Sequence, residues 1–139
     1  MIVQNDLITV HSKGFTDIID LTDDVRSFVQ QNQFKEGQLL VFVNGSTAAI
    51  STVEYEPGLL QDIPALLEKL IPVGQRYKHD DTWHDGNGYA HLRSTIIGTS
   101  FTVPVINGQL QLGTWQQIIL LDFDNKARTR NIVLQFTGI

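Results

Sequence analysis

The sequence predicts an α+β domain in which two main helices pack on a single curved, mostly antiparallel, half-barrel-like sheet. The predicted elements follow the order strands, helix, strands, helix and then many strands. Asn107-Gly108 is a strong two-residue hairpin signal, so the C-terminal half is expected to be a meander. Two helices cannot cover both faces of so large a sheet, and either a curled half-barrel or subunit association would cover the remainder.

The N-terminal elements are expected to be two strands and a helix. Ile2–Val10 is rich in β-branched residues and should end at Lys13-Gly14, with Phe15–Asp20 as its hairpin partner. Thr22 is the expected N-cap of a helix that ends near Gln33.

The middle of the chain predicts a central strand and a second helix. Leu39–Val43 is a continuous apolar run of strand length, so both of its faces are expected to be covered. Ala49–Glu54 follows as another strand. The apolar residues between Leu59 and Leu70 recur at helical spacing, and we expect this helix to begin or kink at Pro64, because an internal proline costs roughly 3 kcal/mol.

The remaining strands follow a polar segment and fill the C-terminal half. Ile118–Leu121 is apolar throughout, which predicts a strand covered on both sides, and Lys126, Arg128 and Arg130 are expected to form a solvated hairpin end. No repeat or linker indicates a second domain, so residues 1–139 are expected to form one. The expected strands are Tyr89–Ile97, Phe101–Ile106, Gln109–Leu112, Trp115–Phe123 and Thr129–Phe136.

Composition excludes several function classes. The chain has no cysteine, which excludes thiol chemistry, thiolate metal ligands and disulfides. Its net charge is −5 and its ten Lys and Arg residues form no stripe, which argues against binding to nucleic acid or anionic lipid. No apolar run approaches the roughly 20 residues of a membrane span. We expect a cytoplasmic protein.

The chemically richest segment is Lys78–Arg93, which contains three of the four histidines. Gly86-Asn87-Gly88 allows a sharp turn, because glycine reaches positive φ without a steric penalty. The residues before this turn are expected to form a loop, and those after it a strand. His79 in the loop should therefore lie beside His91 in the strand.

Strand alternation places Tyr89, His91 and Arg93 on one face. His84 and His11 are expected to be solvated or structural. The carboxylates that the loop adds to the predicted polar site are those of Asp80, Asp81 and Asp85.

Four stretches agree in order and spacing with a known family. They are Gly108–Ile118 (GQLQLGTWQQI), Tyr77–His79, Ala90–Ser94, and Ser46–Ala48 followed by Glu54. The chain resembles the YjbQ-type family, described as secondary thiamine-phosphate synthases, over nearly its whole length. The resemblance implies an α+β fold with a curved sheet, a homotrimer, and weak joining of a pyrimidine diphosphate to a thiazole phosphate.

One departure from the family pattern stands at Gly45. The commoner pattern has His-Thr-Thr where this chain has Gly45-Ser46-Thr47, so any role that rests on the first histidine is absent. Ser46 and Thr47 are expected either to offer amides and hydroxyls to a phosphate or to form a simple turn.

The implied reaction requires pyrophosphate to leave, and the charge on its oxygens must be met by a metal ion or by cationic side chains. Carboxylates suit Mg²⁺ and imidazoles suit Zn²⁺, so the divalent metal stays open. The residues assigned to catalysis are His79, His91, Arg93 and Asp85; those assigned to substrate binding are Ser46, Thr47, Lys78, Asn87 and Gln116; those assigned to a metal are His79, His91 and Glu54.

Two other functions remain open. A non-catalytic trimeric module could capture a small phosphorylated metabolite, or the site could hydrolyse a phosphoester with a metal ion. Trp115 is expected to pack in the core or at a subunit interface. No nucleophile elbow, dinucleotide fingerprint or zinc-protease motif occurs, so covalent catalysis is disfavoured.

Overall fold

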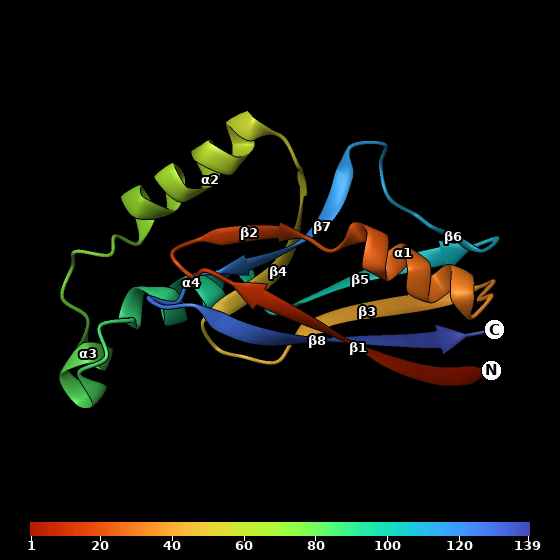
Figure 1. Ribbon diagram of the computed structural model, residues 1–139, viewed down its shortest axis with the longest axis horizontal. Helices are drawn as coiled ribbons and strands as arrows, with labels where there is room; N and C mark the ends of the chain where they lie inside the picture. The colour runs from red at the N-terminus through yellow and green to blue at the C-terminus, as the bar shows by residue number, and fades with distance from the viewer.

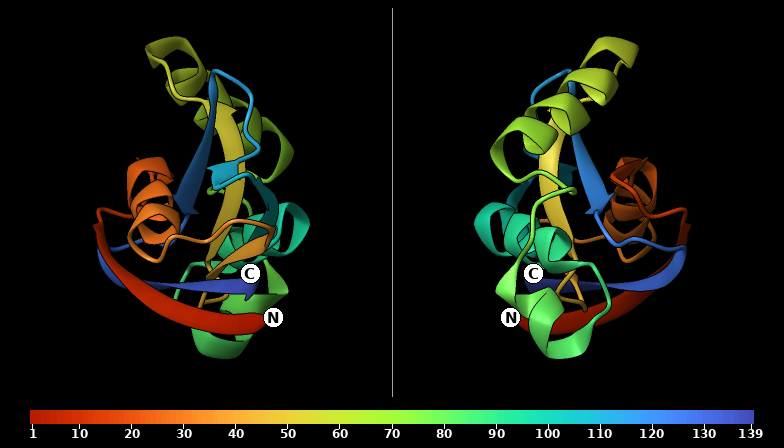
Figure 2. Two further views of the ribbon diagram at one scale, coloured as in Figure 1. Left: turned by 90° about the vertical axis from the view of Figure 1, so that its right-hand side faces the viewer. Right: turned by 90° about the vertical axis from the view of Figure 1, so that its left-hand side faces the viewer.

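Two antiparallel sheets pack around the main core (Figures 1 and 2). The computed structural model describes residues 1–139. The larger sheet has five strands in the order β1-β8-β3-β5-β6, and the smaller has three in the order β2-β7-β4. The elements are β1 (Ile2–Ser12), β2 (Asp17–Asp20), α1 (Thr22–Gln31), β3 (Gly37–Val43), β4 (Ala48–Glu54), α2 (Pro57–Leu70), α3 (Lys78–Trp83), α4 (Gly88–Ile97), β5 (Ser100–Ile106), β6 (Gln109–Leu110), β7 (Gln116–Asp122) and β8 (Arg128–Gly138).

The α+β class and the curled antiparallel sheet are confirmed, and the smaller sheet is an addition to the prediction. The predicted hairpin at Asn107-Gly108 joins β5 to β6, and both residues have positive φ, 50° and 75°. None of the four helices has the length and apolar character needed to cross a membrane.

The main core lies between the two sheets. Leu39 and Val41 of β3 and Ile118 and Leu120 of β7 are fully buried in it. Helix α1 adds one face to this core, because its apolar residues repeat at helical spacing. Those residues are Val25, Phe28 and Val29.

Strand β7 is covered on both sides, as predicted for Ile118–Leu121. Its other two side chains, Ile119 and Leu121, enter a second apolar cluster with Leu67 of α2 and Ala90 of α4. The same prediction for Leu39–Val43 is wrong for the single chain.

In β3 only alternate residues are fully buried, and Phe42 is 36% exposed. The outer face of the larger sheet therefore has no helix over it.

The segment after the Gly-Asn-Gly turn is helix α4, so the predicted strand Tyr89–Ile97 is wrong. Tyr89, Ala90, Arg93 and Ser94 are buried, and this spacing is that of one helix face. The buried face excludes His91, which lies at the half-exposed side of the helix.

Contacts from outside α4 start this helix. The backbone oxygen of Asn87 accepts hydrogen bonds from the amides of Ala90 (2.9 Å) and His91 (3.3 Å). The carboxylate of Asp80 accepts a hydrogen bond from the amide of Gly88 at 2.9 Å, at the helix N-terminus, where a negative charge is favoured. Asp80 itself lies in α3, a short helix inside the segment that was predicted to be a loop.

Helix α2 begins at Pro57, which excludes a start at Pro64. The carboxylate of Glu56 accepts hydrogen bonds from the amides of Gly58 (2.8 Å) and Leu59 (2.5 Å), and proline at the first helical position has no amide to satisfy. Local capping therefore outweighs the cost of an internal proline.

Two predictions for the N-terminal elements are also corrected. Strand β2 pairs with β7 and not with β1. Gly14, Phe15 and Thr16 all have positive φ, and this turn carries the chain from the larger sheet to the smaller one. Thr22 is not the N-cap but the first residue of α1, which is preceded by the N-cap Leu21, and its hydroxyl accepts a hydrogen bond from the amide of Ile118 at 2.8 Å.

Helix α2 has a single buried side chain, Leu67, which makes its docking testable. Leu67→Ala is expected to lower the free energy of unfolding by about 2–4 kcal/mol, because it leaves a cavity under the helix. Leu66→Ala removes the same atoms from a side chain that is 54% exposed, and its effect should lie within about 0.5 kcal/mol. Urea unfolding measures both. Equal losses in the two variants would contradict this packing.

Candidate functional site

His79 and His91 lie side by side at one end of the molecule. Their ring centroids are 4.3 Å apart, with 47° between the planes. α3 carries His79, and α4 carries His91. The predicted proximity of the two imidazoles is confirmed, although helices and not a loop and a strand bring them together.

His79 is oriented by two oxygen atoms. Its Nε2 lies 3.0 Å from Oδ1 of Asn87 and 3.2 Å from Oδ1 of Asp85. Both oxygens are acceptors, so this tautomer carries the proton on Nε2. Asn87 is buried, and its Nδ2 donates to Asp124 at 3.2 Å, so Asn87 is a positioning residue for the imidazole.

The group around His79 has the donor atoms of a metal site. Ligand atoms of His79, Asp80 and Asp85 lie within 4.8 Å of one another, and His91 adjoins them. One oxygen of Asp80 is used by the amide of Gly88, which leaves the other free. The cluster thus offers imidazole nitrogens and carboxylate oxygens from three consecutive segments.

His91 has an unusual environment for a histidine at the surface. Burial and the neighbouring His79 lower the pKa of His91 below its ordinary value, although Asp85, Asp124 and Asp80 oppose this shift. The imidazole of His91 is therefore neutral at neutral pH. A neutral imidazole can accept a proton or bind a metal ion.

A buried ion network lies directly behind the site. Arg130 forms a bidentate pair with Asp122, with Nε–Oδ2 at 2.7 Å and Nη2–Oδ1 at 2.8 Å. Arg128 donates to Asp124 at 2.6 Å. The predicted solvated hairpin end at Arg128 and Arg130 is therefore wrong, and of that cluster only Lys126 is exposed.

Asp124 links this network to His79. Burial alone would raise the pKa of Asp124, but hydrogen bonds from Asn87, the amide of Asn125 and Arg128 hold the pKa below its usual range. Sequence reasoning missed this residue. The only signal was its place directly after a strand that was expected to be covered on both sides.

Arg93 does not face the site. Its side chain is 2% exposed and donates to the backbone oxygen of Ile71, to Glu68 and to Thr16. The guanidinium also lies 5.0 Å from the ring centre of Tyr89. The structure therefore gives Arg93 a structural role in holding the end of α2 against α4.

Two other assigned residues lie at the far end of the smaller sheet. Glu54 pairs with Gln116 at one end of the β4–β7 ladder, while Ala48 pairs with Asp122 at the other. Six residue steps along a strand separate the ends by about 20 Å. Within one chain, neither Glu54 nor Gln116 reaches the histidines.

The remaining assigned residues lie near the network or at the surface. The hydroxyl of Thr47 contacts Asp124 and Arg130, and Ser46 beside it is exposed. Lys78 is exposed at the start of α3. Trp115 is 71% exposed, so the single chain does not bury it as predicted.

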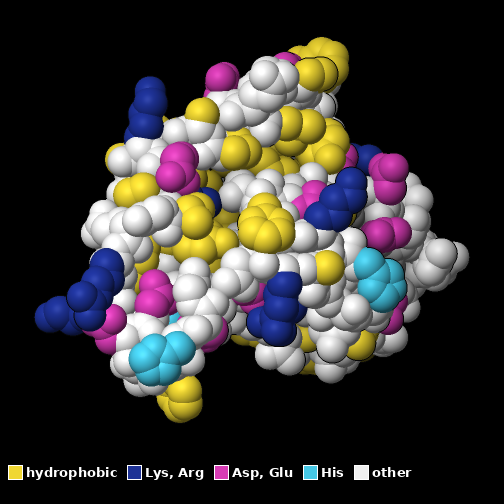
Figure 3. Space-filling model, turned by 60° about the vertical axis from the view of Figure 1, so that its left-hand side comes forward, with side chains coloured by type: hydrophobic (Ala, Val, Ile, Leu, Met, Phe, Trp, Pro, Cys, Tyr) yellow, Lys and Arg dark blue, Asp and Glu magenta, His cyan; other side chains and the backbone are white.

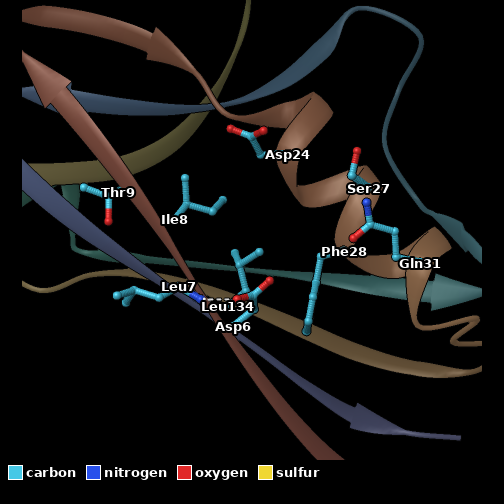
Figure 4. Close-up of a pocket in the computed structure, with 9 residues that line it drawn as sticks. All are labelled: Asp6, Leu7, Ile8, Thr9, Asp24, Ser27, Phe28, Gln31 and Leu134. Carbon is cyan, nitrogen blue, oxygen red and sulfur yellow. Dashed lines mark hydrogen bonds between the residues drawn. The ribbon is translucent and has the colours of Figure 1, made fainter.

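The cavities of the structure lie away from the histidines. One, of about 480 Å³, separates β1 from α1 and is lined by acidic, polar and apolar side chains (Figure 4). A second, of about 470 Å³, lies at the two chain ends. The histidine site is therefore an open surface site. In Figure 3, acidic and basic side chains are spread over the face shown, histidine side chains lie on its lower half, and hydrophobic side chains gather toward its upper part.

Comparison with known proteins places the chain among uncharacterised relatives. Residues 6–139 match the family model described as UPF0047 protein YjbQ-like. A UPF0047 protein of Archaeoglobus fulgidus is 42% identical over 92% of this chain and 97% of its own length, and YugU of Bacillus subtilis is 33% identical over 88% and 90%. The crystal structure of a YbjQ-like protein of unknown function from Sulfolobus solfataricus superposes with a TM-score of 0.93 at 35% identity, covering 99% of this chain and 98% of the other.

The lowered pKa of His91 predicts how stability depends on pH. In the unfolded chain this histidine binds a proton near pH 6.5, and in the folded chain only at lower pH. The stabilisation is therefore fully present above pH 6.5 and is lost as the pH falls through the folded pKa. His91→Gln should remove this part of the pH dependence of urea unfolding, and His84→Gln should retain it. Unchanged pH dependence in His91→Gln would contradict the assignment.

Proposed function

The chain belongs to the YjbQ-like UPF0047 family, and on that premise we propose that it is a metal-assisted transferase of thiamine-phosphate-synthase type. The proposed reaction joins a pyrimidine diphosphate to a thiazole phosphate. One observation carries the proposal: the imidazoles of His79 and His91 meet beside the carboxylates of Asp80 and Asp85 at an accessible surface. The nature of the substrates comes from the family resemblance.

The residues fit a divalent metal ion. Nε2 of His79 already faces oxygen atoms of Asp85 and Asn87, so an ion could replace the Nε2 proton. A mixed set of imidazole and carboxylate donors suits Zn²⁺ or Mn²⁺ better than Mg²⁺. We therefore propose His79, His91 and Asp85 as ligands, with Asp85 in place of Glu54. When bound, the ion would offset the charge that develops on the departing pyrophosphate.

The chain's own residues supply the other roles. In the metal-free chain Asn87 holds the His79 ring by a 3.0 Å hydrogen bond, and Asp124 accepts a hydrogen bond from Asn87 at 3.2 Å. His91 is neutral at neutral pH, so the lone pair of one ring nitrogen is free to bind the ion. Lys78 adds an exposed ammonium group at the start of α3, where it can meet a phosphate.

A homotrimer is part of the proposal. Leu70 (67%) and Trp115 (71%) are large apolar side chains left exposed near the end of α2 and the start of β7. Association would remove this surface from water. It could also bring Glu54 or Gln116 of one subunit to the histidines of another. We place the protein in the cytoplasm, in keeping with the absence of cysteine.

One observation favours the alternative of a non-catalytic metabolite-binding protein. Neither cavity of the single chain touches His79 or His91, and transferases enclose their substrates to exclude water. Calorimetric binding of the phosphorylated substrates without turnover would support this alternative.

Metal binding can be tested without any substrate. Titration of Zn²⁺ or Mn²⁺ into metal-free protein should give one site per chain, and His79→Gln should weaken it by at least about tenfold. Asn87→Ala should also weaken it, because the Oδ1 oxygen of Asn87, which lies 3.0 Å from Nε2 of His79, is then missing beside the ion. His84→Gln, in the same segment, should bind as the wild type does. Equal affinity in wild type and His79→Gln would exclude this site.

The transferase activity has its own test. Purified protein with both half-substrates and a divalent metal should form thiamine phosphate, measured by chromatography. His91→Ala is expected to lower the rate by up to about 100-fold, because a proposed metal ligand is lost, whereas His84→Ala should have no effect. If the wild type forms no thiamine phosphate but releases phosphate from model phosphoesters, the hydrolase function replaces this one.

A further inference from the structure

Arg130 presents an unused pair of N–H donors at the surface beside the histidine site. Its side chain is only 8% exposed, and Nε and Nη2 are taken up by Asp122 and Thr47. Nη1 has no acceptor in the protein. Among side-chain polar atoms that are shielded from solvent, the hydroxyl of Tyr89 is the one that lacks a hydrogen-bond partner. Nη1 of Arg130 also lacks a partner but is not shielded, so it is accessible to solvent.

Gly45 keeps the space in front of this nitrogen open. A Cβ atom at position 45 would lie 2.8 Å from Nη1 of Arg130, closer than such contacts occur. In this chain the missing side chain leaves a gap through which the guanidinium faces outward.

Two backbone amides without an acceptor follow directly after Gly45. The amides of Ser46 and Thr47 donate to no protein acceptor, whereas the amides of Asn44 and Gly45 donate to the backbone oxygens of Asn131 and Val43. The chain bends at each residue from 44 to 47. Consecutive free amides in a bent segment form a concave site for an anion.

The loop is held firmly against Arg130. The hydroxyl of Thr47 accepts from Nη2 of Arg130 at 2.7 Å and donates to Asp124 at 3.1 Å. The amide of Phe123 donates to the backbone oxygen of Thr47 at 3.0 Å. Binding an anion here would therefore cost little ordering of the chain.

We propose that Nη1 of Arg130 and the amides of Ser46 and Thr47 bind a phosphoryl group. A phosphoryl group offers three terminal oxygens to these three donor groups, and guanidinium matches its geometry. Asp122 and Asp124 offset the charges of Arg130 and Arg128, so directional hydrogen bonds and not net charge provide the affinity.

This inference deepens the proposed function. Only the identity of the metabolite that carries the phosphate rests on that function. The loop reaches the histidines through hydrogen bonds from Thr47 to Asp124, from Asn87 to Asp124 and from His79 to Asn87. A substrate phosphate on the loop would therefore sit a few residues from the proposed metal ligands. Ser46 and Thr47 act through their amides, since the Thr47 hydroxyl is already engaged.

The test is a titration of inorganic phosphate followed by amide NMR, with EDTA present and the ionic strength held constant with chloride. The amide signals of Ser46 and Thr47 should shift and saturate. Gly45→Ala should weaken the affinity about tenfold, because the new methyl group fills the gap, the loss expected for one charge-assisted hydrogen bond. Gly45 has no left-handed φ, so alanine does not strain the backbone there.

Gly74→Ala is the matched control, since its new methyl group meets nothing within 4 Å, and it should bind phosphate as the wild type does. His79→Gln should also bind phosphate normally, which separates this site from the proposed metal site. Absence of saturable shifts at Ser46 and Thr47, unchanged affinity in Gly45→Ala, or equally tight binding of acetate would each overturn the proposal. Loss of phosphate binding in His79→Gln would indicate that the anion binds at the histidines and not at Arg130, and it would also overturn the proposal.

Discussion

The buried pair between Arg130 and Asp122 is the contact on which the arrangement of the two sheets depends. Arg130 belongs to β8 of the larger sheet and Asp122 to β7 of the smaller one. Ser12 at the end of β1 donates to the same carboxylate at 2.5 Å, and Thr47 before β4 accepts from the same guanidinium. Apolar packing between sheets tolerates sliding, whereas a bidentate ion pair fixes one register.

The Arg130–Asp122 pair contributes more to the geometry of the fold than to its free energy of unfolding. Burying a guanidinium and a carboxylate costs several kcal/mol of hydration, which their attraction only partly returns, while removal of one partner costs about 3–5 kcal/mol. What the pair provides is geometry. The chain after Asp122 leads directly to Asp124, whose carboxylate holds Asn87 and through it the imidazole of His79. The frame and the site are therefore one continuous hydrogen-bonded unit.

The sequence predicted β7 well, because Ile118–Leu121 is covered on both faces and is therefore apolar without interruption. It failed for α4. Tyr89, His91 and Arg93 fit an alternating pattern, but the burial of Tyr89 and Arg93 fits a helical period equally well over so short a segment. A contact from outside the segment also favours the helix, because Asp80 of α3 accepts a hydrogen bond from the amide of Gly88 at the N-terminus of α4. No local pattern contains that information.

The difference between local sequence patterns and contacts from distant segments also explains which site residues could be predicted. The turn at Gly86–Gly88 brings His79 and His91 together whichever secondary structure flanks it, so their proximity survived a wrong prediction of the strand. Arg93 was misassigned because a cation in a polar segment has the same sequence signature whether it faces solvent or, as here, the backbone oxygen of Ile71. Burial therefore distinguishes structural charged residues from candidate functional ones. Charged groups with protein partners on every side stabilise the fold, and only groups with a free donor or acceptor at the surface can contact a substrate.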